Sequence, residues 1–396
     1  MQIIRMWISR KYETTIRILA EQFPAVVVTG PRQVGKTALV QRIFPDYTYV
    51  TLDIPAIASQ AENHPQAFLE SHPQPLIIDE VQYAPSIFRY LKVLIDQDKT
   101  PGNFILTGSQ NFQLMQGVSE SMAGRCGILN MQNLSYREIQ ESVGVSEDNY
   151  LITGGFPELY AAPKRDFHFW YAAYLSTYLE RDVRNILNVG SLRDFDRFLR
   201  AVAIRTSQFL SYSDIARDVG ISPNTAKKWI SVLQASGQII LLEPYYRNLG
   251  KRLVKSPKLY LCDTGLALFL MGFENIKSVI NHPIIGAIWE THVVMQVHKH
   301  FHAMGKNRPL WFWRTVHGAE TDLLIEQGGR FIAIEIKFSE NPDGKALKGI
   351  KALVSMYGEK SLIAGFVASR TKHVYPLSGL VRAVPGSDID LYLSQE

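Results

Sequence analysis

The run from residue 30 to residue 37 constrains the fold of this chain more than any other feature, because it matches the pattern G-x-x-x-x-G-K-S/T in full. An apolar run precedes it at 25–29, and a helix is expected at 38–43. In such a strand–loop–helix unit, backbone N–H groups of the loop and of the first helical turn surround nucleotide phosphates. The alternative is a chance glycine-rich turn, which the flanking strand and helix disfavour. The residues expected to bind ATP are Gly30, Pro31, Arg32, Gln33, Val34, Gly35, Lys36, Thr37 and Ala38.

Four side chains are expected to carry the chemistry at this loop. Lys36 reaches the β- and γ-phosphates, and the Thr37 hydroxyl ligates Mg²⁺. Another apolar run, at 75–78, leads to Asp79, which is expected to support the Mg²⁺ ion, and to Glu80, which is expected to polarise the attacking water. An activated water favours hydrolysis of ATP over transfer to a second substrate. The alternative is a strand that ends at a solvated acidic turn.

A third apolar run, at 104–107, ends in hydroxyl side chains. If its strand lies between the loop strand and the acidic strand, Thr107 or Ser109 comes close to the γ-phosphate. A simple strand terminus is the alternative. An arginine can supply further positive charge, either within one chain or across the subunit boundary of a homo-oligomer. The candidates are Arg125, Arg181 and Arg184, and for each the alternative is an ordinary surface charge.

Length and composition indicate a globular protein with more than one domain. The 396 residues exceed what one compact core usually holds. No apolar run approaches the roughly 18 residues of a membrane span, which predicts no membrane contact. The two cysteines lie far apart and in no metal-like spacing, which fits a cytoplasmic protein. The net charge of +5 leans towards an anionic partner.

The chain divides into four regions, which together predict an α/β protein. Residues 1–145 alternate strands and helices, which predicts a parallel sheet with helices on its faces. Residues 146–205 are helical and are expected to form a lid or linker, with one long helix at 167–187. Residues 206–280 show the order helix, turn, helix, strand, strand. Residues 281–396 contain a helix, a strand-rich stretch and a second helix.

The third region is expected to be a winged helix. Its second helix begins with Ser222 as N-cap and Pro223 at the first helical position. Polar side chains on this helix and a basic loop between the two strands are what a duplex binder uses for base edges and phosphates. DNA is therefore an expected partner, and a purely structural role is the alternative. The residues concerned are Asn224, Thr225, Lys227, Lys228, Arg247, Lys251, Arg252 and Lys255.

The fourth region contains a possible nuclease site. A hairpin at 320–337 would place Asp322 near Glu335 and Lys337, and period two puts the last two side chains on one face. An acidic pair at that distance can hold Mg²⁺, and a nearby lysine can position a nucleophilic water. Glu290, on an upstream helix, is expected to add a further metal contact. The alternatives are an ordinary surface hairpin and a degenerate, inactive site.

Taken together, these motifs resemble the prokaryotic AAA-superfamily ATPases that carry a C-terminal domain of unknown function. The resemblance implies an AAA-type core at 1–145, a helical lid at 146–205, a winged helix at 206–280 and a PD-(D/E)xK nuclease-like fold at 281–396. In this chain the usual Glu-Val-Asp run reads Glu-Thr-Asp, with both acidic positions kept. The runs that carry the resemblance are 30–37, 78–82, 106–109, 154–158, 318–322 and 334–337.

The leading hypothesis is an ATP-hydrolysing protein that acts on or binds DNA and that carries a candidate Mg²⁺-dependent nuclease site. The second hypothesis is a regulatory ATPase switch whose C-terminal domain only binds a partner. A small-molecule kinase is disfavoured, because Glu80 points to water activation.

Overall fold

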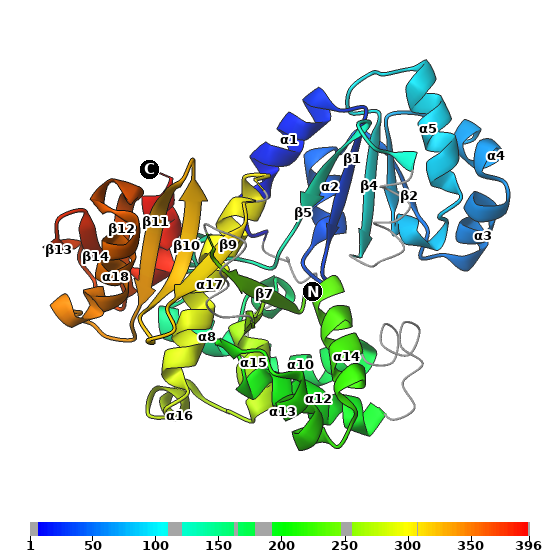
Figure 1. Ribbon diagram of the computed structural model, residues 1–396. Coiled ribbons are helices and arrows are strands. Elements are labelled where there is room, and N and C mark those ends of the chain that lie inside the picture. Colours follow the sequence, from blue (N-terminus) through cyan, green and yellow to red (C-terminus); the bar gives the residue numbers. More distant parts are fainter. Residues whose placement is uncertain are drawn as a thin grey trace.

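The computed structural model describes residues 7–109, 121–161, 165–178, 192–246, 256–306 and 308–394. Two sheets organise the molecule, as Figure 1 shows. A parallel sheet with its helices forms one lobe, a mixed sheet forms a second, and a group of helices lies below both. The chain is thus an α/β protein, as the sequence predicts.

Five strands of the described chain form the parallel sheet, in the order β2-β3-β4-β1-β5. The central strands β1, β3 and β4 are buried along their whole length, as expected for strands covered on both faces. The outer strands β2 and β5 are partly exposed. The bounds are β1 Ala25–Gly30, β2 Thr48–Thr51, β3 Leu76–Asp79, β4 Phe104–Ser109 and β5 Cys126–Asn130.

Helices cover both faces of this sheet because successive side chains of β1 point to opposite sides. Val26 and Val28 pack with α1 and α2 on one face. Ala25 and Val27 pack with α3, α4 and α5 on the other. The bounds are α1 Tyr12–Gln22, α2 Lys36–Ile43, α3 Pro55–Asn63, α4 Pro65–Glu70, η1 Val81–Tyr83 and α5 Ile87–Gln97.

A helical region follows the parallel sheet, as the sequence predicts. The long helix expected at 167–187 begins at Phe167 and is described to Tyr178, so its later part, with Arg181 and Arg184, lies outside the described residues. The bounds are α7 Tyr136–Val143, α8 Glu147–Thr153, α9 Glu158–Ala161, α10 Phe167–Tyr178 and α12 Leu192–Ile204.

A buried carboxylate ties this helical region to its neighbours. Asp263, the N-cap of α15, accepts hydrogen bonds from Asn133 Nδ2 at 2.6 Å and from the Tyr171 hydroxyl at 2.7 Å. It also accepts the backbone N–H of Gly155 at 2.7 Å. The preceding Gly154 has φ 78°, and an added Cβ there would lie 2.2 Å from Asp263 Oδ1. The close approach of Gly154 to Asp263 therefore requires a glycine.

The two helices and the antiparallel strand pair expected at 206–280 are present. The Ser222 hydroxyl accepts the Thr225 N–H at 3.0 Å and Pro223 opens α14, as predicted. The assignment of these elements as a winged helix stays a prediction. The bounds are β6 Gln208–Phe209, α13 Tyr212–Val219, α14 Pro223–Ala235, β7 Ile239–Pro244, β8 Lys258–Leu261, α15 Thr264–Met271 and α16 Ile276–Ile280.

The last region continues the sheet that these strands begin. In the described residues, nine strands run in the order β13-β14-β12-β11-β10-β9-β7-β8-β6. β7 pairs with β9 through Glu243 with Trp311 and Pro244 with Phe312. The bounds are α17 Ile285–Ala303, β9 Leu310–Arg314, β10 Glu320–Gln327, β11 Arg330–Ile336, η3 Gly344–Leu347, α18 Lys348–Tyr357, η4 Glu359–Ser361, β12 Leu362–Ser369, β13 Tyr375–Ser378, β14 Val381–Pro385, η5 Gly386–Asp388 and α19 Ile389–Leu393.

The expected boundary at 280/281 does not separate two cores. One hydrophobic cluster extends from Leu151 to Leu393 and includes the helices below the sheet and one face of the C-terminal strands. A second cluster, on the other face, packs α18 against β10 and β11. Residues 206–280 and the residues after 280 therefore contribute strands to one sheet and side chains to one core.

Candidate functional site: the phosphate-binding loop and its surroundings

The loop between β1 and α2 has a backbone that depends on its glycines. Gly30 has φ 145°, and an added Cβ would lie 2.0 Å from the carbonyl oxygen of Met131. Gly35 has φ 89° at the N-cap of α2. Lys36 is buried, and its ammonium donates to the carbonyl oxygens of Gly30 at 3.1 Å and Pro31 at 2.8 Å. The loop therefore has the curled form that directs the N–H groups at the start of α2 towards an anion.

Hydroxyl groups from β2, β4 and α2 converge on Asp79 at the end of β3. The Thr37 hydroxyl donates to Asp79 Oδ1 at 2.8 Å, and the Thr107 hydroxyl donates to the same oxygen. The Tyr49 hydroxyl donates to Asp79 Oδ2 at 3.0 Å. Burial and then the negative charge of Asp79 raise the pKa of Tyr49 to about 12. Thr37 and Asp79 were both expected at the Mg²⁺ ion, whereas no motif in the sequence indicated Tyr49.

The strand order explains why Thr107 reaches Asp79. β4 lies between β1 and β3, as the sequence analysis required for a hydroxyl near the γ-phosphate. Thr107 is therefore the hydroxyl residue that lies between the loop strand and the acidic strand. Ser109 lies at the end of β4 beside Gly30. Among the described residues, the buried side-chain oxygen of Ser109 has no hydrogen-bond partner, which suits an atom that binds a ligand.

Glu80 follows Asp79 in a strained backbone conformation. Its φ of 56° and ψ of 45° lie in the left-handed region, which costs a non-glycine residue roughly 1–2 kcal/mol. The Glu80 N–H donates to the Thr107 hydroxyl at 3.4 Å, and the side-chain amide of Gln82 donates to the Glu80 carboxylate. Strain of this kind concentrates at functional sites because the surrounding structure holds it.

Two adjoining cavities open at this loop. One of about 500 Å³ is lined by Lys36, Thr37, Glu80 and Tyr174, among others. The other, of about 680 Å³, is lined by Trp7, Arg42, Glu158 and Trp170, among others. Gln33, Gly35 and Ala38 line both. The cavities thus meet at the start of α2, where the phosphates of a nucleotide bind.

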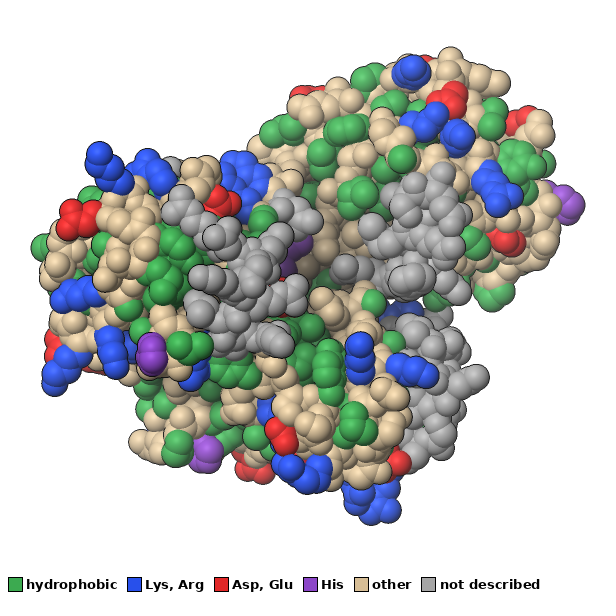
Figure 2. All heavy atoms as spheres, in the orientation of Figure 1, with side chains coloured by type: hydrophobic (Ala, Val, Ile, Leu, Met, Phe, Trp, Pro, Cys, Tyr) green, Lys and Arg blue, Asp and Glu red, His purple; other side chains and the backbone are tan. Residues whose placement is uncertain are grey.

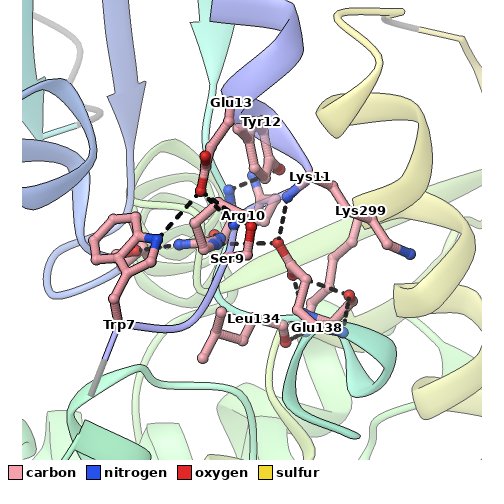
Figure 3. Close-up of polar contacts among 12 residues, drawn as sticks. Trp7, Ser9, Arg10, Lys11, Tyr12, Glu13, Leu134, Glu138 and Lys299 are labelled. Atoms are coloured by element: carbon pink, nitrogen blue, oxygen red, sulfur yellow. Dashed lines mark hydrogen bonds and ion pairs between the residues drawn. The ribbon is translucent and has the colours of Figure 1, made fainter. Parts of the chain in front are cut away.

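Arg10, a buried arginine outside the sequence motifs, forms a hydrogen bond to the loop backbone, and Figure 3 shows it beside Glu138. Arg10 donates from Nη1 to the carbonyl oxygen of Val34 at 2.7 Å and from Nη2 to that of Gln132 at 2.7 Å. Its Nε donates to Glu138 Oε1 at 3.1 Å. Burial alone would raise the pKa of Glu138, but the charge of Arg10 and the hydrogen bonds from Ser135, Lys11 and Arg10 together outweigh burial and lower it. Arg10 lies before β1, so no motif indicated its role.

The structure does not bring Arg125 to the loop of its own chain. β5 runs parallel to β1, and Cys126 pairs with Ala25, at the end of the sheet opposite the loop. The intervening length of β1 is roughly 16 Å at the usual rise of a strand. Arg125 instead forms an ion pair with Asp96, with Nε 2.6 Å from Oδ1. A role for Arg125 within one chain is therefore wrong, and a role across subunits stays a prediction.

The expected hairpin of the C-terminal region is present. β10 and β11 are antiparallel, and Leu323 pairs with Ile334. The Lys337 ammonium lies 3.5 Å from Asp322 Oδ2 and 3.3 Å from Glu335 Oε2, as predicted from the register. Burial and then the charge of Asp322 raise the pKa of Glu335 well above its ordinary value, which favours its protonated form.

A second lysine, unforeseen from the sequence, enters this cluster from β8. The Lys258 ammonium lies 2.9 Å from Glu290 Oε1 and 2.5 Å from Glu320 Oε1. Burial alone would lower the pKa of Lys258, but Glu290, Asp322 and Glu320 outweigh burial and raise it. In the described residues no three or more His, Cys, Asp or Glu side chains are grouped so that they could hold a metal ion. As built, the predicted ligands Glu290, Asp322 and Glu335 do not fit Mg²⁺, because ammonium groups stand between the carboxylates.

The surface offers limited support for an anionic partner. On the described part of the face in Figure 2, Lys and Arg side chains are spread over all lobes and do not gather in one patch. Asn224, Lys227 and Lys228 of α14 are exposed. The basic loop with Arg247, Lys251, Arg252 and Lys255 lies outside the described residues. No helix in the described ranges has the length and hydropathy of a membrane span.

Family models match three successive parts of the chain. The model of an AAA domain matches residues 22–140. Two domains of unknown function follow, DUF8612 at 146–277 and DUF4143 at 285–389. The matched AAA domain contains the loop, Asp79, Glu80 and Thr107. It identifies the parallel sheet as a P-loop ATPase module.

Solved structures resemble this chain only weakly and at low sequence identity. A Walker-type ATPase of Pyrococcus abyssi is 15% identical, with a TM-score of 0.45 over 67% of this chain and 96% of that chain. A RuvB variant of Thermotoga maritima is 18% identical, with a TM-score of 0.35 over 60% of this chain and 93% of that chain. Neither similarity is close enough to carry an argument about function.

Two curated relatives match almost the whole chain. Uncharacterized proteins of Mycobacterium tuberculosis and of Mycobacterium bovis are each 31% identical over 381 residues, which cover 94% of this chain and 82% of the relative. The AAA part of the resemblance found in the sequence is confirmed, and the C-terminal part is a domain of unknown function. The chain therefore belongs to the family of these mycobacterial proteins, and it is a P-loop ATPase of the AAA superfamily with a C-terminal domain of unknown function.

Proposed function

We propose that the chain hydrolyses ATP with Mg²⁺ at the loop, with Glu80 as the residue that polarises water. The observation that carries the proposal is the convergence of Thr37 and Thr107 on Asp79, directly before Glu80. Hydroxyl and carboxylate oxygens are a donor set that suits Mg²⁺, so Thr37 and Asp79 fit the ion. When bound, Mg²⁺ would neutralise charge on the phosphate oxygens.

Each side chain has a separate part in this proposal. The Lys36 ammonium lies at the mouth of the loop and binds the β- and γ-phosphates in place of its carbonyl partners. Thr107 and Ser109 lie beside the loop, where their hydroxyls orient the γ-phosphate. Glu80 lines the same cavity as Lys36 and Thr37, within reach of a water that attacks that phosphate.

Glu80→Gln and Lys36→Ala test this assignment through phosphate release and binding of a fluorescent ATP analogue. Loss of a general base costs about 10²–10⁴-fold in rate, so Glu80→Gln should lose turnover and keep nucleotide binding. Lys36→Ala should weaken binding itself. Wild-type protein without ATP turnover at any Mg²⁺ or DNA condition would refute hydrolysis.

The base and ribose of the nucleotide belong in the larger cavity, on the other side of Gln33, Gly35 and Ala38. Trp7 offers an indole face there, and the Arg42 guanidinium lies 4.8 Å from its ring centroid. Trp7→Ala should weaken ATP binding by roughly tenfold, the scale of one lost stacking contact. Binding of inorganic tripolyphosphate should not change. Equal losses for both ligands would place the base elsewhere.

A second proposal concerns DNA, and the exposed face of α14 supports it. Asn224, Lys227 and Lys228 project from the helix that would enter a groove. Binding to duplex DNA over a salt series should show a log–log slope that falls by about 2 in Lys227→Ala/Lys228→Ala, because two phosphate contacts are lost. Lys92→Ala/Lys99→Ala on the ATPase module, both exposed, is the matched control. If Lys227→Ala/Lys228→Ala shows the same salt dependence of DNA binding as wild type, the proposal that α14 binds DNA is refuted.

A regulatory switch, the alternative considered above, gains no support from the comparisons. Cytoplasmic location and a homo-oligomer stay predictions. Nuclease activity would depend on the C-terminal carboxylates Glu290, Asp322 and Glu335, which lie against the ammonium groups of Lys258 and Lys337.

A further inference from the structure

The carboxylates of the C-terminal cluster already have cations built into the fold. Lys258 bridges Glu290 on α17 and Glu320 on β10, and its side chain is 5% exposed. The Tyr260 hydroxyl donates to the same Glu290 oxygen at 2.6 Å. Two side chains of β8, Lys258 and Tyr260, therefore donate hydrogen bonds at one face of the cluster. Their spacing by two residues puts both on the same side of the strand.

The other carboxylate oxygens are also largely in use. Asp322 Oδ2 accepts the backbone N–H of Ile336 at 2.8 Å and lies near Lys337. Lys337 bridges Asp322 and Glu335, much as Lys258 bridges the other pair. Arg314 Nη1 lies 2.9 Å from Glu320 Oε2. Four carboxylates thus face three cationic side chains.

A divalent ion cannot join this arrangement unchanged. Mg²⁺ and Mn²⁺ need a shell of about six oxygen ligands, whereas Glu290 and Glu320 direct oxygens at an ammonium. An ion placed between them would also meet the positive charge of Lys258 at contact distance in a buried site, where like charges repel strongly. The position between α17 and β10 therefore holds either the ammonium or a metal ion.

We propose that Lys258 is a built-in cation that occupies the place of a divalent metal between α17 and β10. The folded wild-type chain then binds no divalent ion at this cluster. Removal of the ammonium leaves the facing oxygens of Glu290 and Glu320 without their cation, and a divalent ion that draws in Asp322 as a third carboxylate can then take its place. The inference does not depend on ATP hydrolysis, because the phosphate-binding loop uses none of these residues.

Titration of the full-length, nucleotide-free protein with Mn²⁺, followed by calorimetry and by the electron paramagnetic resonance of free Mn²⁺, tests the proposal. Lys258→Met keeps much of the side-chain stem and removes the charge. It should bind one Mn²⁺ per chain more than wild type, at least tenfold more tightly than any Mn²⁺ bound by wild type. Lys258→Met/Asp322→Asn should lose the gained ion. Lys258→Arg, which keeps the charge, should gain none.

Three results would each overturn the proposal. The first is a Lys258→Met protein that has wild-type circular dichroism and gains no Mn²⁺, and the second is a Lys258→Arg protein that does gain one. The third needs no change at Lys258. If wild-type protein binds a Mn²⁺ ion that Asp322→Asn abolishes, the cluster is a metal site with the ammonium in place. We expect wild type and Asp322→Asn to bind Mn²⁺ equally. This comparison tests whether the cluster binds a metal ion with the ammonium in place, even if Lys258→Met does not fold.

Discussion

Arg10 donates a hydrogen bond of 2.7 Å to the carbonyl oxygen of Val34, in the middle of the phosphate-binding loop. The same guanidinium pairs with Glu138, whose N–H and hydroxyl partners at Ser135 close the first turn of α7. Lys299 of α17 donates to the carbonyl oxygen of Leu134, next to that turn. The loop is thus connected through Arg10 to the start of α7 and to the helix of the C-terminal region (Figure 3).

Replacement of Arg10 by methionine should loosen the loop and destabilise the fold. The change leaves Glu138 buried without its cation, which costs about 3–5 kcal/mol in comparable buried pairs. Urea unfolding measures the loss of stability, and a fluorescent nucleotide measures the expected loss of affinity. Arg10→Met/Glu138→Gln should recover part of the stability but not the affinity, because the contact to Val34 stays absent. Recovery of both would mean that Arg10 acts on the loop only through folding.

Thr107→Val should slow turnover with little effect on nucleotide affinity. Valine keeps the buried shape and removes the hydroxyl that donates to Asp79 and accepts the Glu80 N–H. A hydrogen bond to a charged group contributes about 1.5–3 kcal/mol, and about 1.4 kcal/mol is tenfold in rate, so kcat should fall at least roughly tenfold. Tyr49→Phe removes a hydroxyl from the other Asp79 oxygen and serves as the comparison. A kcat unchanged in Thr107→Val would show that β4 only supports the site.

Asp263→Asn should cost more stability than any change at one of its partners. The amide has one oxygen and two donors, whereas Asn133, Gly155 and Tyr171 all present donors to it. Unpaired buried donors cost about 1–3 kcal/mol each. Tyr171→Phe, which removes a single donor, should cost about 1 kcal/mol. Thermal unfolding of both variants checks this order, and the reverse order would contradict it.

Stability should fall as the pH drops from about 6.5 towards 4, because α17 buries histidines in their neutral form. Burial lowers the pKa of His292 to about 3 and that of His302 to about 4. In this window the unfolded chain binds protons at these residues and the folded chain does not. Each histidine then contributes a slope of up to about 1.4 kcal/mol per pH unit.

His292→Gln/His302→Gln should weaken this pH dependence. Around His292 the charged neighbour is Lys299, which disfavours a second positive charge, and the Ser387 hydroxyl bonds to its Nε2 at 2.7 Å. Urea unfolding at pH 7 and pH 5 compares the double variant with wild type. The exposed His373→Gln should behave as wild type. If the free energy of unfolding of the double variant still falls with pH as steeply as that of wild type, groups other than His292 and His302 cause the acid sensitivity.

Arg125→Ala should leave turnover per chain unchanged in dilute, monomeric protein. The guanidinium pairs with Asp96 at the end of the sheet away from the loop, so it contacts no phosphate in its own chain. ATP turnover measured across protein concentrations separates the two remaining cases. A loss that appears only at concentrations where wild type self-associates would establish Arg125 as a residue acting across subunits.

The phosphate site was predictable because its signals are local. Residues 30–37 are consecutive, and Asp79 and Glu80 follow a buried strand whose neighbours can be inferred from parallel-sheet topology. Asp322, Glu335 and Lys337 were placed together by hairpin register alone. These predictions need only periodicity and short connections.

The missed residues act over long sequence separations. Arg10 meets Val34 across 24 residues and Glu138 across 128, and Lys258 meets Glu290 across 32. A buried lysine at the start of a strand has the same local sequence as an exposed one, so only the tertiary fold distinguishes them. Arg125 was a candidate only because its charge could serve a phosphate, and it lies at the end of β5 away from the loop.

The pairing of β7 with β9 determines how this protein can be divided for experiments. A chain that stopped at residue 280 would leave the outer side of β7 without a neighbour, with its N–H and carbonyl groups open to any other strand. It would also expose the apolar face that now packs against α17 and the later strands. A shortened protein of this kind is expected to aggregate, so the isolated 206–280 segment is a poor substitute for the whole chain in DNA-binding work.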